Sequence, residues 1–344
     1  MSGTTSGRTM SERRGWGRLR TAAAWTAVGA WGAWALVRLT GADRLPGIEI
    51  PSAPLLAITP YVVAAAPVPI TAALLLRRWR AAAVAGVVAA GLLVAVVPRA
   101  VGGGDPVARG PVLRVLTANL LLGGADPARL VDLVRRTKAD VLSLQELPPE
   151  GVDRYERAGL TGLLPEKALD ARPGAAGSGL YSRHPLRVLP PLPGTELAMP
   201  RAELTLPGGR RVEMTAVHPV PPIDTVSFRA WKRDLAVLPS ARPAVAAAGG
   251  RAHAPGDGPV RILAGDFNAT LDHANLRRLI GRGYADAADR AGAGLVPTWG
   301  LDDPRPALTI DHVLVDRRCA VGEVEVHDLE GSDHRAVFAE VRLP

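Results

Sequence analysis

The feature that most constrains this chain is uncharged, apolar sequence in its first hundred residues. Three stretches carry no charged residue: Thr21–Val37, Ser52–Leu76 and Ala81–Val97. Each is close to the roughly 20 residues that an α-helix needs to cross about 30 Å of hydrocarbon. The sequence therefore predicts three transmembrane helices within residues 21–98, after a basic cytoplasmic tail over residues 1–20.

Two of these stretches have special features. The first resembles the apolar region of a signal peptide, but it is long and no A-x-A cleavage site follows it. The second contains Pro60, Pro67 and Pro69, which predict a kinked or broken helix.

The arginines between the stretches predict the orientation. The N-terminal tail has five, and the loop after the second stretch has Arg77, Arg78 and Arg80. The loop after the first stretch has only Arg38 and Arg44, which are offset by two acidic residues. Because positive loops remain in the cytoplasm, the remainder of the chain is expected on the extracytoplasmic side.

A glycine-rich linker over residues 99–110 separates the apolar third from a soluble domain over residues 111–344. The domain mixes strands, helices and a hairpin signal at Pro207–Arg210, which favours an α+β fold of two packed sheets with helices outside. Cys319 is the only cysteine, so no intrachain disulfide can form. A glycine- and alanine-rich segment over residues 241–258 is expected to be a surface loop.

Candidate chemistry begins at Gly265-Asp266-Phe267-Asn268, which follows the apolar run Val260–Ala264. In an extended segment Asp266 and Asn268 would point to the same side, where they could hold a water and a phosphate oxygen. The alternative is ordinary turn chemistry, since both residue types favour turns.

Polar groups recur at other strand ends. They are Asn119, Glu146, His218, Asp333 and His334, and Asp311 begins a further strand. Carboxylates and amides suit a hard cation such as Mg²⁺, and histidines suit proton transfer near neutral pH. These groups are sufficient for metal-assisted attack of water on phosphorus.

Eight short motifs now indicate a family resemblance. They are T-A-N at 117–119, L-Q-E at 144–146, S-G-L-Y-S-R at 178–183, H-P-V-P-P at 218–222, G-D-F-N at 265–268, P-T-W at 297–299, I-D-H-V at 310–313 and S-D-H at 332–334. Together they resemble the endonuclease/exonuclease/phosphatase superfamily of DNase I-like nucleases, inositol polyphosphate 5-phosphatases and sphingomyelinases. The resemblance implies a four-layer α/β/β/α sandwich that hydrolyses phosphoesters with Mg²⁺ or Mn²⁺.

The resemblance also implies roles for individual residues. Metal binding falls to Asn119, Glu146 and Asp333. Catalysis falls to His218, Asp266, Asn268, Asp311 and His334, with Asp311 paired to His334.

Two further residues are candidates for substrate binding. Arg183 would contact phosphate and Thr298 would line the cleft, although a solvated arginine and a packed loop residue are equally good interpretations.

Three apolar stretches before such a domain are also similar to the VanJ-type membrane proteins of actinobacteria, which are associated with glycopeptide resistance. Tethering to a lipid bilayer favours a lipid-linked phosphate or pyrophosphate as substrate, and no protein partner is inferred. A nuclease acting on nucleic acid is the alternative, although the domain has no lysine-rich run. A non-catalytic binding module is the third hypothesis, which the intact set of acids and histidines argues against.

Overall fold

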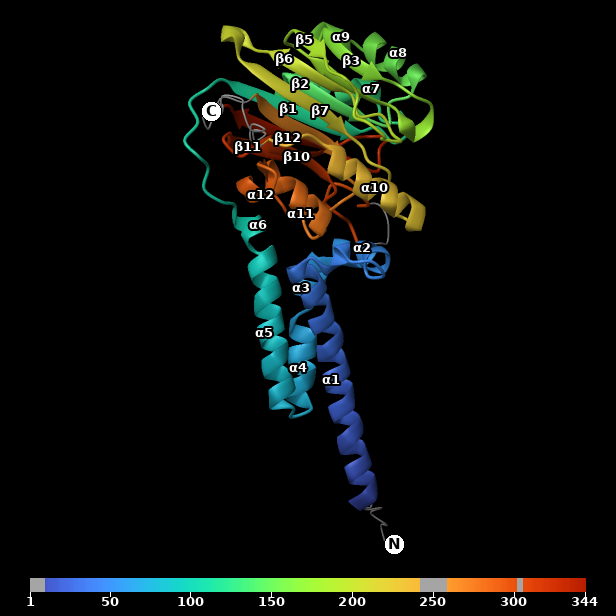
Figure 1. Cartoon of the computed structure of the whole chain (residues 1–344), viewed down its shortest axis with the longest axis vertical. Coiled ribbons are helices and arrows are strands. Elements are labelled where there is room, and N and C mark those ends of the chain that lie inside the picture. The colour runs from blue at the N-terminus through green and yellow to red at the C-terminus, as the bar shows by residue number, and fades with distance from the viewer. Residues whose placement is uncertain (1–9, 242–258, 302–305) are drawn as a thin grey trace, which may run out of the picture.

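The computed structural model describes residues 10–241, 259–301 and 306–344, so the loop expected over residues 241–258 falls outside the described residues except for Ala241. A helical stem leads into a two-sheet domain at one end of the molecule (Figure 1). The stem contains the helices α1 (Met10–Thr40), α2 (Glu49–Ala57), α3 (Thr59–Ala64), α4 (Pro67–Leu75), α5 (Trp79–Val96) and α6 (Pro98–Val101), with a 3₁₀ turn η1 (Ala42–Arg44).

The second apolar stretch is broken, as its prolines predict. Pro60 lies in the first turn of α3 and Pro67 begins α4, positions where the missing N–H costs no helical hydrogen bond. The chain therefore changes direction around Ile58, and α2 lies across the underside of the domain while α3 and α4 run along the stem (Figure 1).

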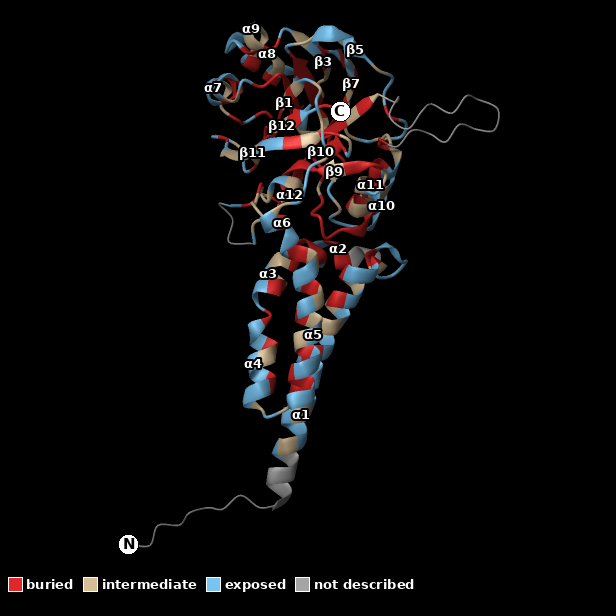
Figure 2. Cartoon of the chain, turned by 90° about the vertical axis from the view of Figure 1, so that its left-hand side faces the viewer, coloured by how far each residue is buried: buried red, intermediate tan, exposed pale blue. Residues whose placement is uncertain are grey.

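Among the described residues, one helix is by length and composition apolar enough to cross a membrane, Trp79–Val101. The first apolar stretch lies inside α1 but includes three tryptophans, and the second is divided among short helices. The expectation of three spans therefore stays a prediction. The helices α1, α4 and α5 do pack side by side along the stem (Figures 1 and 2).

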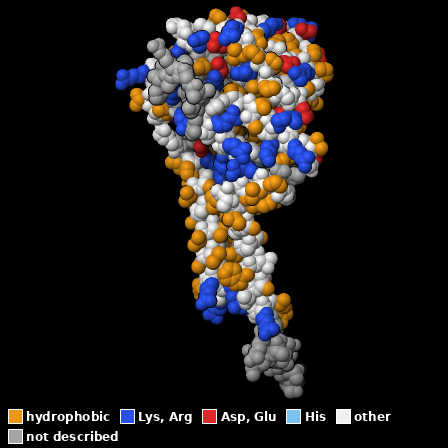
Figure 3. All heavy atoms as spheres, viewed as in Figure 1, with side chains coloured by type: hydrophobic (Ala, Val, Ile, Leu, Met, Phe, Trp, Pro, Cys, Tyr) orange, Lys and Arg blue, Asp and Glu red, His pale blue; other side chains and the backbone are white. Residues whose placement is uncertain are grey.

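Both basic clusters of the stem lie at the same end, far from the domain. The Arg78 guanidinium donates a hydrogen bond of 2.7 Å from Nη2 to the carbonyl oxygen of Gly17, next to Arg18. Figure 3 shows lysine and arginine side chains at this tip, and apolar or uncharged side chains along the visible stem above it. The stem therefore has a basic tip and an apolar flank between that tip and the domain.

The domain contains two six-stranded sheets. The first has the order β11-β12-β1-β2-β4-β3 and the second β5-β6-β7-β8-β10-β9. The strands of the first are β1 (Val112–Asn119), β2 (Val141–Gln145), β3 (Glu166–Asp170), β4 (Ser178–Ser182), β11 (Ala320–Asp328) and β12 (Arg335–Arg342). Those of the second are β5 (Leu186–Val188), β6 (Arg201–Thr205), β7 (Arg211–Val217), β8 (Val260–Asp266), β9 (Tyr284–Asp286) and β10 (Asp311–Asp316).

The sheets pack face to face with helices on both outer sides, which confirms the expected α+β class with two sheets. Alternate residues of each strand point to opposite faces, so Val115 and Val313 lie between the sheets while Leu116 and Leu314 lie beneath helices. Burial on both faces explains the apolar runs of β1, β8 and β10. The covering helices are α7 (Pro127–Thr137), α8 (Pro149–Arg157) and α9 (Leu160–Leu163) on one side, and α10 (Thr225–Val237), α11 (Ala274–Ile280) and α12 (Ala287–Ala291) on the other (Figure 1).

A buried ionic cluster fixes the stem to the domain. Asp272 is fully buried before α11 and accepts two hydrogen bonds from Arg99 of α6, at 2.7 and 2.8 Å. Arg38, in the last turn of α1, donates from Nε to the same carboxylate. One aspartate of the domain thus holds both ends of the apolar segment.

Two further bonds reinforce this junction. The Asp43 carboxylate of η1 accepts a 2.8 Å hydrogen bond from the backbone N–H of Ala274, so a stem residue supplies an anion to the first turn of α11. His273 accepts the Thr270 N–H at Nδ1 and therefore donates from Nε2 to the carbonyl oxygen of Ala53 in α2, at 2.8 Å. As a result, α2 is held against the domain.

We predict that Asp272→Asn strongly destabilises the full-length protein, because it leaves two buried guanidinium groups without their anion. The expected loss is about 3–5 kcal/mol in the free energy of unfolding. Asp132→Asn is the matched control, since it breaks an exposed pair with Arg136 whose loss costs about 0–1 kcal/mol. Equal shifts of the unfolding midpoint in detergent for both variants would contradict the role given to Asp272.

Candidate active site

Strand pairing brings the polar strand ends together at one edge of the sandwich. β1 and β2 are parallel, as are β7 and β8, so Asn119, Glu146, His218 and Asp266 all lie at carboxyl ends of strands. β10 and β12 run antiparallel to their neighbours, which puts Asp311 directly opposite Asp266 and His334 near the end of β1. Polar residues that are far apart in the sequence therefore lie close together at this end of the sandwich.

Asn119 joins the two sheets at this edge. Its side-chain Nδ2 donates to Glu146 Oε1 at 3.1 Å and to Asp266 Oδ2 at 3.2 Å. Its Oδ1 accepts the backbone N–H of Leu121 at 3.0 Å, and its carbonyl accepts the Ser332 hydroxyl at 2.8 Å. Because Asn119 is fully buried, these bonds fix its amide between two carboxylates.

Glu146 adopts an unusual backbone conformation. It has φ of 56°, in the left-handed region that non-glycine residues avoid. Its Oε2 accepts the N–H of Leu122 at 2.7 Å, and Leu122 is also left-handed. Such local strain concentrates at functional sites, where surrounding contacts hold it.

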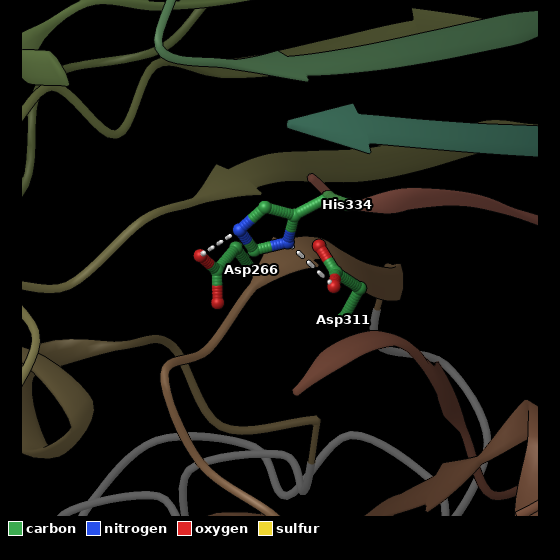
Figure 4. A group of neighbouring side chains, drawn as sticks. All are labelled: Asp266, Asp311 and His334. Carbon is green, nitrogen blue, oxygen red and sulfur yellow. Dashed lines mark hydrogen bonds and ion pairs between the residues drawn. The ribbon is translucent and has the colours of Figure 1, made fainter. Parts of the chain in front are cut away.

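His334 and Asp311 form a pair beside Asp266 (Figure 4). The imidazole Nδ1 lies 2.9 Å from Asp311 Oδ2, and Nε2 lies 3.9 Å from Asp266 Oδ2. Asp311 therefore orients the ring so that its other nitrogen faces Asp266. The three residues are buried, with His334 the most exposed at 6 %.

Burial and charge separate the pKa values of this group. Burial, and then the Asp311 carboxylate, raise the pKa of Asp266 to about 7. Burial lowers the pKa of His334, but the charge and hydrogen bond of Asp311, together with the charges of Asp266 and Asp333, outweigh burial and raise this pKa to about 10. Burial and the nearby His334 lower the pKa of His218 to about 3. At neutral pH His334 is therefore a cation, His218 is neutral, and Asp266 is poised to exchange a proton.

His218 faces the same carboxylates. Its Nε2 lies 3.9 Å from Asp266 Oδ2 and 4.0 Å from Glu146 Oε1. Its Nδ1 is buried without a hydrogen-bond partner among the described residues.

Asn268 does not continue the strand, contrary to the extended geometry that the sequence suggested. β8 ends at Asp266, and Asn268 turns with φ of 48°. Its N–H donates to Asp266 Oδ1 at 2.7 Å and its side chain donates to the Pro219 carbonyl at 3.0 Å. The turn and the candidate site are therefore not alternatives, because the turn at Asn268 holds the Asp266 carboxylate in place.

The structure places Asp333 at the site and Thr298 behind it. The Asp333 Oδ1 lies 4.0 Å from His334 Nε2, and Oδ2 accepts the Trp299 indole N–H at 2.9 Å; no described hydrogen bond or ion pair joins Asp333 to Asn119 or Glu146. Thr298 is buried, and its Oγ1 accepts the N–H groups of Ile310 and Asp311 at 3.0 and 3.1 Å. Thr298 thus positions Asp311 and does not line the cleft.

Arg183 lies outside this site. It follows β4, whose last residue pairs with Val141 at the start of β2, so it is at the opposite edge of the sheet. Its guanidinium contacts Asp140 and the Ala139 carbonyl. We therefore do not assign Arg183 to substrate binding.

A cavity of about 540 Å³ opens over these side chains, a size typical of ligand pockets. Glu146, His218, Asp266, Asn268 and His334 line its floor. Its other walls are largely apolar and include Ala53, Pro54 and Ala57 of α2, Leu121, Ile223 and Leu308. None of its described lining residues is lysine or arginine. Sequence reasoning missed the α2 wall, since an apolar stretch in sequence carries no sign of the domain it will contact.

The donor set of the site fits a divalent cation. Glu146 and Asp266 offer carboxylate oxygens, ligands that Mg²⁺ prefers, on either side of the Asn119 amide, whose Nδ2 contacts both and whose Oδ1 accepts the Leu121 N–H. Asp266, Asp311 and His334 are a second cluster with metal-ligand spacing. In that cluster Asp311 already holds His334, so we favour Glu146 and Asn119 as ligands.

This fold and this site define a class, the divalent-metal phosphoester hydrolases. The family model described as Endonuclease/Exonuclease/phosphatase family matches residues 116–334, and the chain belongs to that family. This confirms the resemblance seen in the motifs.

Solved structures share the fold at low identity. An endonuclease/exonuclease/phosphatase from Beutenbergia cavernae is 22% identical with a TM-score of 0.52, over 68% of this chain and 72% of that one. TDP2 from D. rerio, humanized by 14 mutations, is 19% identical with a TM-score of 0.50, over 67% and 98%. No curated protein sequence matches the chain.

We predict that Thr298→Val lowers stability by about 1–3 kcal/mol, because two buried N–H groups lose their acceptor while the side-chain shape is kept. Thermal unfolding of the full-length protein measures the loss. Thr137→Val, which removes a hydroxyl that only donates to carbonyls of its own helix, is expected to be near neutral. A neutral Thr298→Val would show that Asp311 does not depend on this side chain.

We also predict that His334 titrates near pH 10 in the metal-free protein and that Asp311→Asn lowers its pKa, since the charge and the hydrogen bond of Asp311 are lost while burial still opposes the cation. Its pKa is raised on folding, so the stabilisation is complete below about pH 6.5 and is lost as the pH rises through about 10.

Nuclear magnetic resonance of ¹³C-labelled histidine follows the ring, and His334→Gln assigns the signal. An unchanged titration in Asp311→Asn would contradict the pairing as the cause.

Proposed function

We propose that the protein is a membrane-anchored, Mg²⁺-dependent phosphoester hydrolase that acts on a lipid-linked phosphate or pyrophosphate at the extracytoplasmic face. One observation carries the proposal: the catalytic cavity is walled by α2 of the stem. A substrate in this cavity contacts Ala53, Pro54 and Ala57 on one side and the catalytic acids and histidines on the other. The site is therefore next to the segment that would meet the bilayer.

The charge of the cavity supports a lipid over a nucleic acid. A nuclease needs a basic groove to follow the phosphate backbone. The described walls of this cavity are apolar and have neither lysine nor arginine. An apolar wall instead suits a phosphate that is attached to hydrocarbon.

The orientation rests on the stem. Arg18 and Arg78 lie together at the tip that is farthest from the domain. With the positive tip in the cytoplasm and the apolar flank in the bilayer, the domain lies outside. Three passes, formed by α1, by α3 with α4, and by α5, give the same result (Figure 1).

The side chains divide the reaction among them. Asp266, with its raised pKa, accepts a proton from the attacking water as the new oxygen–phosphorus bond forms. The bond between phosphorus and the leaving oxygen breaks, and the leaving group departs with the electron pair, as a phosphate anion from a pyrophosphate or as an alkoxide, which takes a proton from water, from an ester. His334, a cation held by Asp311, lies 3.9 Å from Asp266 and favours the anionic form of that carboxylate, which is the form that accepts the proton. Neutral His218 donates from Nε2 to a phosphate oxygen. Mg²⁺ held by Glu146 and Asn119 supplies Lewis-acid stabilisation of the phosphate charge.

The biological role follows from the substrate class. Lipid-linked pyrophosphates at the outer face include carriers of cell-wall precursors. The similarity of the architecture to VanJ-type membrane proteins, associated with glycopeptide resistance, would place the enzyme in that chemistry.

We predict Mg²⁺-dependent phosphate release from a polyprenyl pyrophosphate by purified full-length protein, with a supercoiled plasmid assayed in parallel. Asp266→Ala combined with His334→Ala should reduce the rate by at least about 10²-fold, because it removes the proton acceptor and its neighbouring cation. Arg183→Ala should retain the rate, since Arg183 lies outside the cavity. Plasmid nicking without phosphate release would instead establish the nuclease alternative.

A further inference from the structure

A second cavity lies beside the catalytic one. It has a volume of about 250 Å³ and lies, open on one side, between α3 of the stem and the domain segments 270–272, 294–297 and 307–309. Ala57 and Leu308 line both cavities, so the two are neighbours across these side chains. A ligand that contacts Ala57 in the catalytic cavity therefore lies next to the second cavity.

The walls of the second cavity are mainly apolar. The stem contributes Pro60, Tyr61 and Ala64, and the domain contributes Leu295 and Leu308. Its charged members, Arg99 and Asp272, are joined by two hydrogen bonds of 2.7 and 2.8 Å, and Arg38 donates to the same carboxylate. The other described lining residues are uncharged and mainly apolar, so the surface that they form suits hydrocarbon.

The helix break produces this space. Pro60 starts α3 at an angle to α2, and Tyr61 then reaches the domain through a 2.8 Å hydrogen bond from its hydroxyl to the Ala307 carbonyl. Tyr61 and Ala64 are exposed on the stem, on the same short helix that leads into the apolar surface of α4. The cavity thus lies where the flank that would face lipid meets the domain.

We infer that this second cavity binds the hydrocarbon chain of the lipid phosphate, with the chain passing over Ala57 and Leu308 while the phosphate occupies the catalytic cavity. The inference rests on the proposed function and adds its chain-binding site. The occupant is the chain nearest the phosphate, which enters from the bilayer beside α3. Selectivity for long chains then comes from contacts that a short, water-soluble phosphoester cannot make.

The test measures hydrolysis of prenyl pyrophosphates with 5, 10 and 15 carbons by the full-length protein. These chain lengths are on the order of the cavity size, so each added unit buries more hydrocarbon. Wild type should gain at least about tenfold in kcat/KM from the shortest to the longest chain, because each buried methylene adds affinity. Ala64→Phe and Ala307→Phe, which fill the cavity from opposite walls, should abolish that gain and leave the rate on the shortest substrate unchanged.

Ala65→Phe is the matched control, since Ala65 is the exposed neighbour of Ala64 and lines neither cavity. It should keep the wild-type gain. A gain that survives both filling variants would overturn the chain-binding site and leave the proposed function standing. No hydrolysis of any prenyl pyrophosphate by wild type would overturn the proposed function and the inference with it.

Discussion

The candidate active site depends on the close approach of β7 and β8 at Gly265. A side chain there would put its Cβ 2.0 Å from the carbonyl oxygen of Val217, so only glycine allows the two strand ends to lie together. This approach sets His218 beside Asp266, and the register of β10 then sets Asp311 opposite. Asn119 completes the arrangement by bonding Asp266 of one sheet and Glu146 of the other.

Much of this fold is predictable because local and global signals agree. Helix α7 begins at Pro127, as an aspartate followed by proline indicates, and Asp126 does accept the Arg129 N–H as its N-cap. Strands buried on both faces can be predicted from sequence, because they are continuous apolar runs. The polar residues at their ends stand out against those runs, which is why the site residues could be named from sequence.

Other features of the fold and the site could not be predicted from the sequence, for physical reasons. β3, β5 and β9 are edge strands, paired on one side only and in part exposed, so they lack an apolar run. The placement of Thr298 and Arg183 follows from strand register, which a motif does not report. The α2 wall follows from a buried contact between Ala53 and His273, more than two hundred residues apart. The spacing of residues along the chain does not report strand register or long-range contacts of this kind.

The stem and the site are therefore one structure: Asp272 locks α1 and α6 to the domain, and α2 closes the cavity over the catalytic residues. The most direct test is the anomalous diffraction of crystals of the full-length protein grown with Mn²⁺. The account predicts a peak at about 2 Å from the Glu146 carboxylate, beside Asn119 and inside the cavity that α2 walls. A peak between Asp266, Asp311 and His334, or none in the cavity, would contradict it.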